Sequence, residues 1–215
     1  MPAPLVMPAK AGIHVSPSRY LPGGTAMLLR FALLACLLAF TGCTPGPRVD
    51  AAQMPPQSGL GDPANAIQYA AWAFASPSRT RNDPTSGARA IATLDYLGGA
   101  LVNSPAWMSF SPIIADQMVD ARTAMRRALG IAPTASSQFV VNSMLNTAAA
   151  MTHGDRQAAL AFLSGPIYTL GPDQTLALVT NLPFIHMANV ATIEAEGAMN
   201  GNFCMLGCAQ GGSFL

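Results

Sequence analysis

The strongest constraint on the fold is a series of helix start and stop signals that enclose apolar residues at helical spacing. The clearest helix is predicted from Ser111, which can cap the N-terminus, through Pro112 at the first helical position, to Gly130 at the end. Five apolar residues between these signals recur three or four positions apart: Ile114, Met118, Ala121, Met125 and Leu129. Other elements must cover such a stripe, so this helix belongs to a packed domain.

Similar patterns predict further helices on both sides of this one. We expect them over residues 62–76, 86–101, 134–152, 155–163, 173–180 and 183–199, with Asp62 and Asp155 as N-caps. No segment shows the alternation of apolar and polar residues that marks a half-buried strand. The sequence therefore predicts an all-α fold, a compact antiparallel array of about six or seven helices within a domain that spans residues 62–200.

A pair of adjacent glycines, Gly98 and Gly99, interrupts the helix predicted over residues 86–101. Glycine lowers helix propensity and also removes the side chain that normally keeps a neighbour away. The pair is consistent with a kink, with a helix end or with the close approach of another helix. The sequence pattern leaves these three alternatives open.

A different kind of signal occupies residues 27–43. Arg30 precedes an unbroken apolar run from Phe31 to Phe40, and Thr41, Gly42 and Cys43 follow. One positive charge, a short apolar core and small residues before a cleavage position are typical of a secretory signal peptide. An uncleaved membrane-spanning helix fits less well, because it needs about 20 apolar residues.

The Thr41-Gly42-Cys43 sequence resembles the lipobox of bacterial lipoproteins, with Phe40 at the position where that family most often has Leu. The resemblance covers only the signal region. It implies that Cys43 receives a diacylglycerol on its sulfur, that the preceding peptide is cleaved, and that lipid on Cys43 holds the protein on a membrane of the cell envelope. Because Thr44 rather than Asp follows the cysteine, the resemblance also implies the outer membrane, facing the periplasm.

The stretch that precedes this signal is unusual for the start of an exported protein. Residues 1–26 contain five prolines and no apolar periodicity. We interpret Met27 as the true start and residues 1–26 as a mis-assigned start, with an unusually long leading region as the alternative. The whole of residues 1–42 is therefore treated as a signal region and left out of the fold prediction.

The segments on either side of the helical domain are predicted to lack regular structure. Residues 43–61 follow the lipidated cysteine with four prolines and three glycines, which predicts a flexible linker, a disordered tether. Residues 201–215 form a glycine-rich tail that contains a pair of cysteines, Cys204 and Cys208.

We expect a disulfide between Cys204 and Cys208. Disulfides persist in exported compartments, and a loop of this size can bring the two Cα atoms to the required separation of roughly 4.4–6.8 Å. The alternative is a copper(I) or zinc site that uses Met199, Met205 or a histidine as a further ligand. The ligand spacings of a four-ligand zinc site and of c-type haem attachment are both absent from the sequence. We therefore expect no metal and no cofactor.

The charge content limits the classes of partner. Residues 43–215 contain eight arginines and no lysine against all ten acidic residues of the chain, a formal net charge of −2. This balance provides no run of positive charge to neutralise phosphates, so we expect no nucleic-acid partner. A surface with so few charges also tends to associate with other surfaces.

The sequence contains no set of catalytic residues that we can recognise. The nucleophile elbow, the metalloprotease helix and the phosphate-binding loop are all absent. We expect His153 at a helix end, where a cation interacts with the last carbonyls, and His186 to be partly buried and hydrogen-bonded. Asp116 and Asp120 are interpreted as solvated charges. They lie in the first half of their helix and Arg122, Arg126 and Arg127 in its last half, an order that complements the helix dipole. We assign no catalytic residue and favour a protein that is not an enzyme.

The sequence supports two hypotheses for the function of this protein. The favoured hypothesis is a membrane-anchored envelope lipoprotein that acts as a non-enzymatic scaffold or docking protein for an envelope protein partner. The alternative is a carrier of an apolar ligand or lipid between methionine-rich helices, since methionine side chains adapt to ligands. An enzyme has the least support from the sequence.

Overall fold

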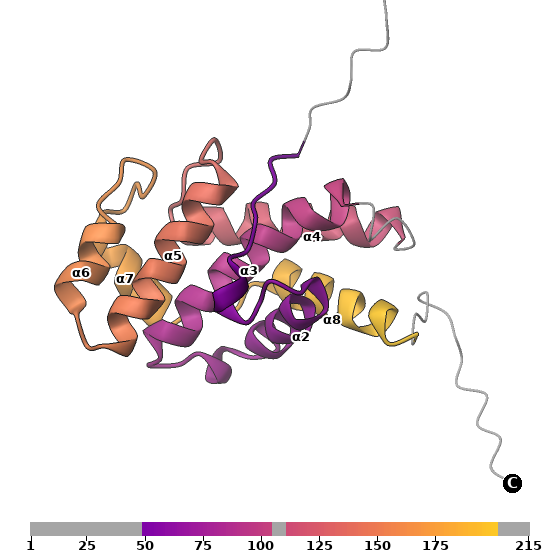
Figure 1. Ribbon diagram of the computed structural model, residues 1–215, viewed down its shortest axis with the longest axis horizontal. Helices are drawn as coiled ribbons and strands as arrows, with labels where there is room; N and C mark the ends of the chain where they lie inside the picture. Colours follow the sequence, from indigo (N-terminus) through magenta and orange to yellow (C-terminus); the bar gives the residue numbers. More distant parts are fainter. Residues whose placement is uncertain (1–48, 105–110, 202–215) are drawn as a thin grey trace, which may run out of the picture. The chain divides into compact units, whose positions relative to one another are not determined.

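The computed structural model describes residues 49–104 and 111–201 of the chain. Within these ranges the chain forms seven α-helices, two short 3₁₀ helices and no strand (Figure 1). In order they are η1 (Pro56–Ser58), α2 (Pro63–Phe74), η2 (Pro77–Arg79), α3 (Pro84–Asn103), α4 (Pro112–Ala128), α5 (Ser137–Thr152), α6 (Arg156–Phe162), α7 (Pro172–Thr180) and α8 (His186–Met199). The predicted all-α fold is confirmed, and so is the expected number of helices.

The predicted N-caps are present in the structure. The side chains of Asp62, Ser111 and Asp155 each accept a hydrogen bond from a backbone N–H in the first turn of the following helix, at 2.9, 3.3 and 2.9 Å. Helix α3 begins two residues earlier than predicted, because Asp83 caps it and Pro84 takes its first position. Asp83-Pro84 repeats the signal at Asp62, so this helix start was also readable in the sequence.

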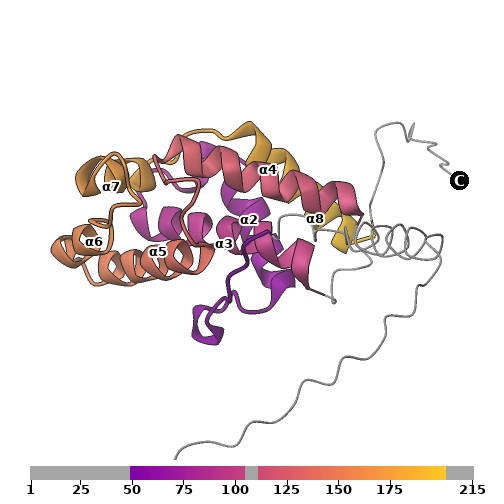
Figure 2. The same ribbon diagram turned by 90° about the horizontal axis from the view of Figure 1, so that it is seen from above.

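Helix α3 lies at the centre of the array. It contacts α2, α4, α5 and α7, and fourteen of its twenty residues are buried. Helices α4 and α5 lie on different sides of α3 (Figure 2). Helix α6 packs against α5, α7 packs against α3 and α6, and α8 packs against both α2 and α4 (Figure 1). A helix that is buried almost all round forms the core to which the other helices are added.

The glycine pair in α3 marks a close approach, which was the third of the alternatives considered above. Helix α3 continues through both residues. A Cβ atom placed on Gly98 would lie 2.9 Å from Cδ of Arg122, and one placed on Gly99 would lie 2.5 Å from the carbonyl oxygen of Asp50. Gly98 therefore admits a side chain from α4, and Gly99 admits the backbone of the segment before η1.

That segment corrects the prediction of a flexible linker over residues 43–61, because residues 49–61 pack onto the helices. Ala52, Met54 and Leu60 are buried, with 6%, 7% and 4% of their surface exposed. Gln53 exchanges two hydrogen bonds with the side chain of Gln138 on α5, of 2.7 and 3.1 Å. Proline and glycine predicted the irregular backbone, but only the assembled helices provide the surface that buries these apolar side chains. Residues 43–48 lie outside the described residues.

Helix α5 starts three residues later than predicted, because the chain after α4 pairs with the loop between α6 and α7. The N–H of Ala132 donates to the carbonyl of Ile167, and the N–H of Thr169 donates to the carbonyl of Gly130, both at 2.8 Å. Between these bonds Ile131 forms an isolated antiparallel bridge with Tyr168. The two loops therefore hold each other in place at one end of α4.

Candidate functional site

An ion pair between Arg126 on α4 and Asp95 on α3 lies in the interior of the domain. The exposed fractions of the two side chains are 7% and 0%. Nε and Nη2 of Arg126 donate to the two carboxylate oxygens, each over 2.7 Å. This paired arrangement matches the planar fork of a guanidinium to a carboxylate. It supplies the partner without which a buried charge would cost several kcal/mol.

The remaining N–H groups of Arg126 are also occupied. Nη1 donates to the carbonyls of Pro133 (3.3 Å) and Ala135 (2.7 Å), and Nη2 donates to Oγ of Ser137 (2.9 Å). An arginine carries five N–H donors, and all five of Arg126 have a partner. Arg126 thus has no donor left for a ligand, and its role is to hold the turn before α5 against α3 and α4.

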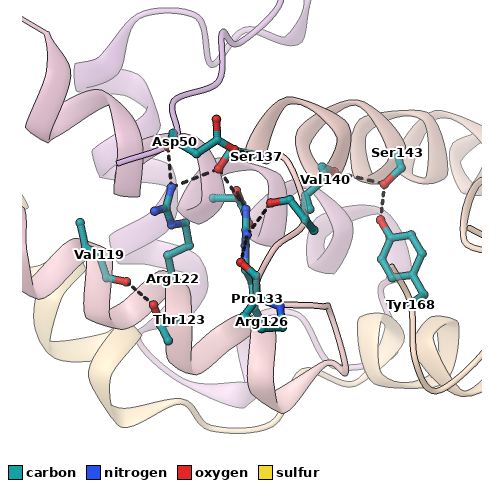
Figure 3. A network of polar contacts seen from close by, with 12 residues as sticks. Asp50, Val119, Arg122, Thr123, Arg126, Pro133, Ser137, Val140, Ser143 and Tyr168 are labelled. Atoms are coloured by element: carbon teal, nitrogen blue, oxygen red, sulfur yellow. Dashed lines mark hydrogen bonds and ion pairs between the residues drawn. The ribbon is translucent and has the colours of Figure 1, made fainter. Parts of the chain in front are cut away.

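Arg122 lies one helical turn before Arg126 and joins the same group of contacts (Figure 3). Its Nη1 donates to the carbonyl of Asp50 at 2.8 Å and to Oγ of Ser137 at 3.1 Å. The carboxylate of Asp50 in turn accepts the backbone N–H of Ser137, the first residue of α5, at 2.5 Å. We call Asp50, Asp95, Arg122, Arg126 and Ser137 the arginine network.

The arginine network brings two cations and two anions together, so its charges balance formally; Asp95, Arg122 and Arg126 are buried, whereas Asp50 is exposed. Burial lowers the pKa of Arg122 because it disfavours the charged form. Asp95 and Asp50 oppose this shift, whereas the neighbouring Arg126 adds to it. The mutual neutralisation explains how Arg122, with only 8% of its surface exposed, is accommodated inside the domain.

The contacts of Ser137 argue against a nucleophilic role. Its Oγ accepts hydrogen bonds from both Arg122 and Arg126. A nucleophilic serine needs a general base within hydrogen-bond reach. The two histidines in the described part of the chain, His153 and His186, are both exposed on the surface. The arginine network therefore has a structural role: its contacts join α3, α4 and the start of α5.

A second buried polar contact joins α5 to the loop after α6. The hydroxyl groups of Ser143 and Tyr168 are hydrogen-bonded to each other, and the Ser143 hydroxyl also contacts the carbonyl of Val140 (Figure 3). Burial raises the pKa of Tyr168 to about 12, although the hydrogen bond with Ser143 opposes the shift. Tyr168 is thus held neutral and fixes its loop to α5.

One pocket lies between η1, the start of α3 and α5. Its volume is about 500 Å³. Seven polar residues in its lining define what we call the Arg89 pocket: Gln57, Ser58, Thr85, Arg89, Asn142, Asn146 and Thr152. Leu145 and Ala149 contribute apolar surface. A concave site of this size with several convergent polar groups is typical of a small-molecule site.

A second pocket, of about 380 Å³, lies at the C-terminal end of α4. Arg122, Arg126 and Arg127 line it together with the chain from Gly130 to Pro133. Because Arg126 has no free donor and Arg122 is engaged with Asp50 and Ser137, the exposed Arg127 is the least committed cation there. This pocket is largely the outer side of the arginine network.

The predicted site residues are distributed as follows. Cys43, Cys204 and Cys208 lie outside the described residues. His153 stands directly after α5, at the helix end where it was expected. The expectation of a partly buried His186 was wrong, because it is the exposed first residue of α8, with its ring edge-on to Phe184 and 6.3 Å between ring centroids.

The predicted solvated charges on α4, Asp116 and Asp120, are exposed, and so is Arg127. Arg122 and Arg126 are buried, which sequence reasoning missed. A signal for their burial was present in the sequence. Both arginines follow Met118 at intervals of four residues and thus share the register of the buried stripe. The register alone does not establish burial, because arginine is rarely buried unless it is paired.

In residues 49–104 and 111–201 no three histidine, cysteine or acidic side chains are grouped so that they could hold a metal ion. In the same ranges, no helix combines the length and the apolar character needed to cross a membrane. No known protein family, curated protein or solved structure matches this chain. The function must therefore be argued from the residues and their geometry.

Proposed function

We propose that this protein is an envelope lipoprotein, anchored by lipid on Cys43 to the outer membrane and facing the periplasm, and that it acts as a non-enzymatic scaffold or docking protein. The observation that carries the proposal is the integration of the segment behind the anchor into the helical domain. Asp50 binds both Arg122 and the N-terminus of α5, and Met54 is buried in the core.

This integration limits how far the domain stands from the membrane. Asp50 follows Cys43 by seven positions, and seven residues span at most about 25 Å when fully extended. A lipid on Cys43 would therefore hold Asp50 within about 25 Å of the bilayer surface. Such a short connection restricts the orientations of the domain, which suits a protein that presents one surface to a partner.

The interior of the domain gives the apolar-carrier alternative no comparable support. Met118, Met125 and Met144 are each 0% exposed and fill the core among other apolar side chains. The two pockets described above expose arginine and hydroxyl groups, and in one of them amide groups, beside their apolar surface. A lipid or other apolar molecule finds a poor match in such linings, because burying unpaired polar groups is costly.

The first test concerns the anchor. Mass spectrometry of the native protein should find an N-terminal peptide that begins at a lipid-modified Cys43. A Cys43→Ala variant should incorporate no radioactive palmitate, whereas Cys36→Ala, which changes a cysteine of the region to be cleaved, should be labelled like the wild type. A peptide that spans Gly42 and Cys43 in the mature protein would rule out this anchor.

The second test concerns docking. Crosslinking in native membranes, followed by gentle solubilisation, should recover a partner protein in a fixed stoichiometry. Displacing the Asp50 segment with Gly99→Ala should reduce this recovery, because the segment sets the orientation of the domain. Gly165→Ala is the control and should leave the recovery unchanged, because its added Cβ makes an ordinary contact, 3.5 Å from the Phe139 ring. A monomer that carries a bound apolar molecule would instead favour the carrier.

A further inference from the structure

Arg89 on α3 is half-buried and forms no ion pair with an acidic side chain of the described residues. The ion pairs in the described part of the chain are Arg126–Asp95 and Arg156–Asp173. Nη2 of Arg89 donates one hydrogen bond of 3.0 Å, to the carbonyl of Ser58. Its Nε is buried and has no hydrogen-bond partner. A desolvated donor without a partner destabilises the folded protein and is rare in native structures.

The guanidinium group of Arg89 is nevertheless held in position. It lies 5.4 Å from the ring centroid of Tyr69, in the range of a cation–π contact. The hydroxyl of Tyr69 donates to the carbonyl of Ser86 at 3.1 Å, so the ring itself is fixed to the start of α3. These contacts place the cation before any ligand arrives, which reduces the entropy that binding would otherwise cost.

The surroundings of Arg89 supply hydrogen-bonding groups but no negative charge. Asn142 and Asn146 lie one turn apart on α5, and Thr85 lies in the first turn of α3. Oδ1 of Asn142 accepts a hydrogen bond of 3.0 Å from Gln138, which leaves the NH₂ group of Asn142 available to a ligand. No aspartate or glutamate lines the Arg89 pocket. The pocket thus presents a positive potential and several donors.

We propose that the Arg89 pocket binds a small polar organic molecule through a carboxylate group. The carboxylate contacts the Nη edge of Arg89, where Nη1 and one N–H of Nη2 have no partner among the described residues. The negative charge also offsets the uncompensated burial of Nε, since the positive charge is delocalised over the guanidinium. Asn142 and Asn146 bind the remaining polar groups, and Leu145 contacts the apolar part of the molecule.

The single cation and the size of the pocket define the class of ligand. One guanidinium matches one carboxylate, whereas a nucleotide or polyphosphate would call for more positive charge. A pocket of about 500 Å³ accommodates a molecule of the size of an amino-acid derivative, and is too small for a folded partner. This binding activity is independent of the docking function proposed above, and either can fail without the other.

The Nε–H of Arg89 provides a direct probe, because its burial protects the proton from exchange with water. We would record arginine side-chain NMR spectra of the full mature protein in detergent during titration with N-acetyl-alanine. The neutral control is N-acetyl-alaninamide at the same ionic strength. The Arg89 Nε–H resonance should shift to saturation as N-acetyl-alanine is added. The affinity for N-acetyl-alaninamide should be at least about tenfold lower, because the amide cannot form the charge-assisted hydrogen bond.

Variants separate a binding role from a structural one. Arg89→Gln should weaken N-acetyl-alanine binding by about tenfold or more, whereas Arg156→Gln, which removes an exposed arginine, should leave it within about twofold. Asn146→Ala keeps the cation and should still weaken binding, without loss of helix content. Equal affinity for acid and amide, or no saturable shift of the Arg89 resonance, would overturn the proposal.

Discussion

The carboxylate of Asp50 accepts a hydrogen bond of 2.5 Å from the backbone N–H of Ser137, which lies 87 positions later in the chain. The N-cap residue of α5, Ser136, makes no side-chain cap bond of its own. Asp50 therefore caps α5 from a distance and places a negative charge at the positive end of the helix dipole. The segment behind the proposed anchor is thus part of the folded domain.

Replacing Asp50 with alanine should cost about 1 kcal/mol of unfolding free energy, the usual cost of losing an N-cap. It should also release the neighbouring segment, seen as faster hydrogen exchange of the Gln53 N–H. Asp62→Ala removes the local cap of α2 and provides the control, with a similar loss of stability but unchanged exchange at Gln53. Unchanged exchange in the Asp50 variant would show that the apolar contacts alone hold the segment.

Gly99→Ala should displace the same segment from the other side. The new Cβ would lie 2.5 Å from the carbonyl oxygen of Asp50, too close for the segment to remain in place. Helix α3 itself should not suffer, because alanine favours a helix over glycine by about 1 kcal/mol. We expect rapid proteolytic cleavage within residues 49–61 with unchanged circular dichroism. Gly165→Ala should resist the protease like the wild type, and equal resistance of both variants would contradict the prediction.

Replacing Asp95 with alanine should destabilise the domain by about 3–5 kcal/mol, because Arg126 would keep its charge in the interior without its forked partner. Urea denaturation measures the loss. The double variant Asp95→Leu, Arg126→Met should lose less than the single variant, since it leaves no unpaired charge. The exposed pair is the control: Asp173→Ala should cost less than about 1 kcal/mol. A loss below about 1 kcal/mol for Asp95→Ala as well would contradict a stabilising role of the buried ion pair.

Tyr168 should make the domain sensitive to alkali. Burial raises its pKa to about 12 in the folded protein, against about 10 for an unfolded chain. The contribution of neutral Tyr168 to the free energy of unfolding is therefore fully present below about pH 10. It is lost as the pH rises from about 10 to 12, because in this range only the unfolded chain releases the tyrosine proton. The expected loss is about 3 kcal/mol, because each pKa unit corresponds to about 1.4 kcal/mol.

Unfolding free energies measured between pH 9 and pH 12 test this prediction, with Tyr168→Phe as the comparison. Residues 43–215 contain no lysine, so few other groups titrate in this range. The phenylalanine variant should show a smaller decline, with Tyr69 and Tyr96, whose pKa values burial also raises, accounting for the remainder. Parallel curves for the two proteins would show that Tyr168 ionises without unfolding the domain.

Local signals in the sequence account for where the helices begin. Asp62 and Ser111 cap helices by contacts within two residues, and Asp155 does so within three, so these contacts depend only on neighbours along the chain. The apolar stripe of α4 likewise follows from helical periodicity alone. For these reasons the all-α fold and most helix positions were predictable without knowledge of the tertiary structure.

The register of α4 also held information about Arg122 and Arg126, since both lie in line with Met118. It indicated the face of the helix, but it could not identify Asp95, 31 positions from Arg126, as the partner. A buried arginine and a solvated one have the same local sequence signature. What distinguishes them is whether a carboxylate on another helix lies within reach.

The amino-acid sequence by itself determined the helices, their caps and the signal-like region that ends at Cys43, because each depends on residues a few positions apart. The tertiary structure alone decided that Asp50 caps α5, that Asp95 pairs with Arg126 and that Arg89 forms no ion pair with an acidic side chain of the described residues. Each of these depends on which distant segments meet in the assembled helices. Burial then sets the energies, because a charge or N–H group removed from water must find its partner inside the protein.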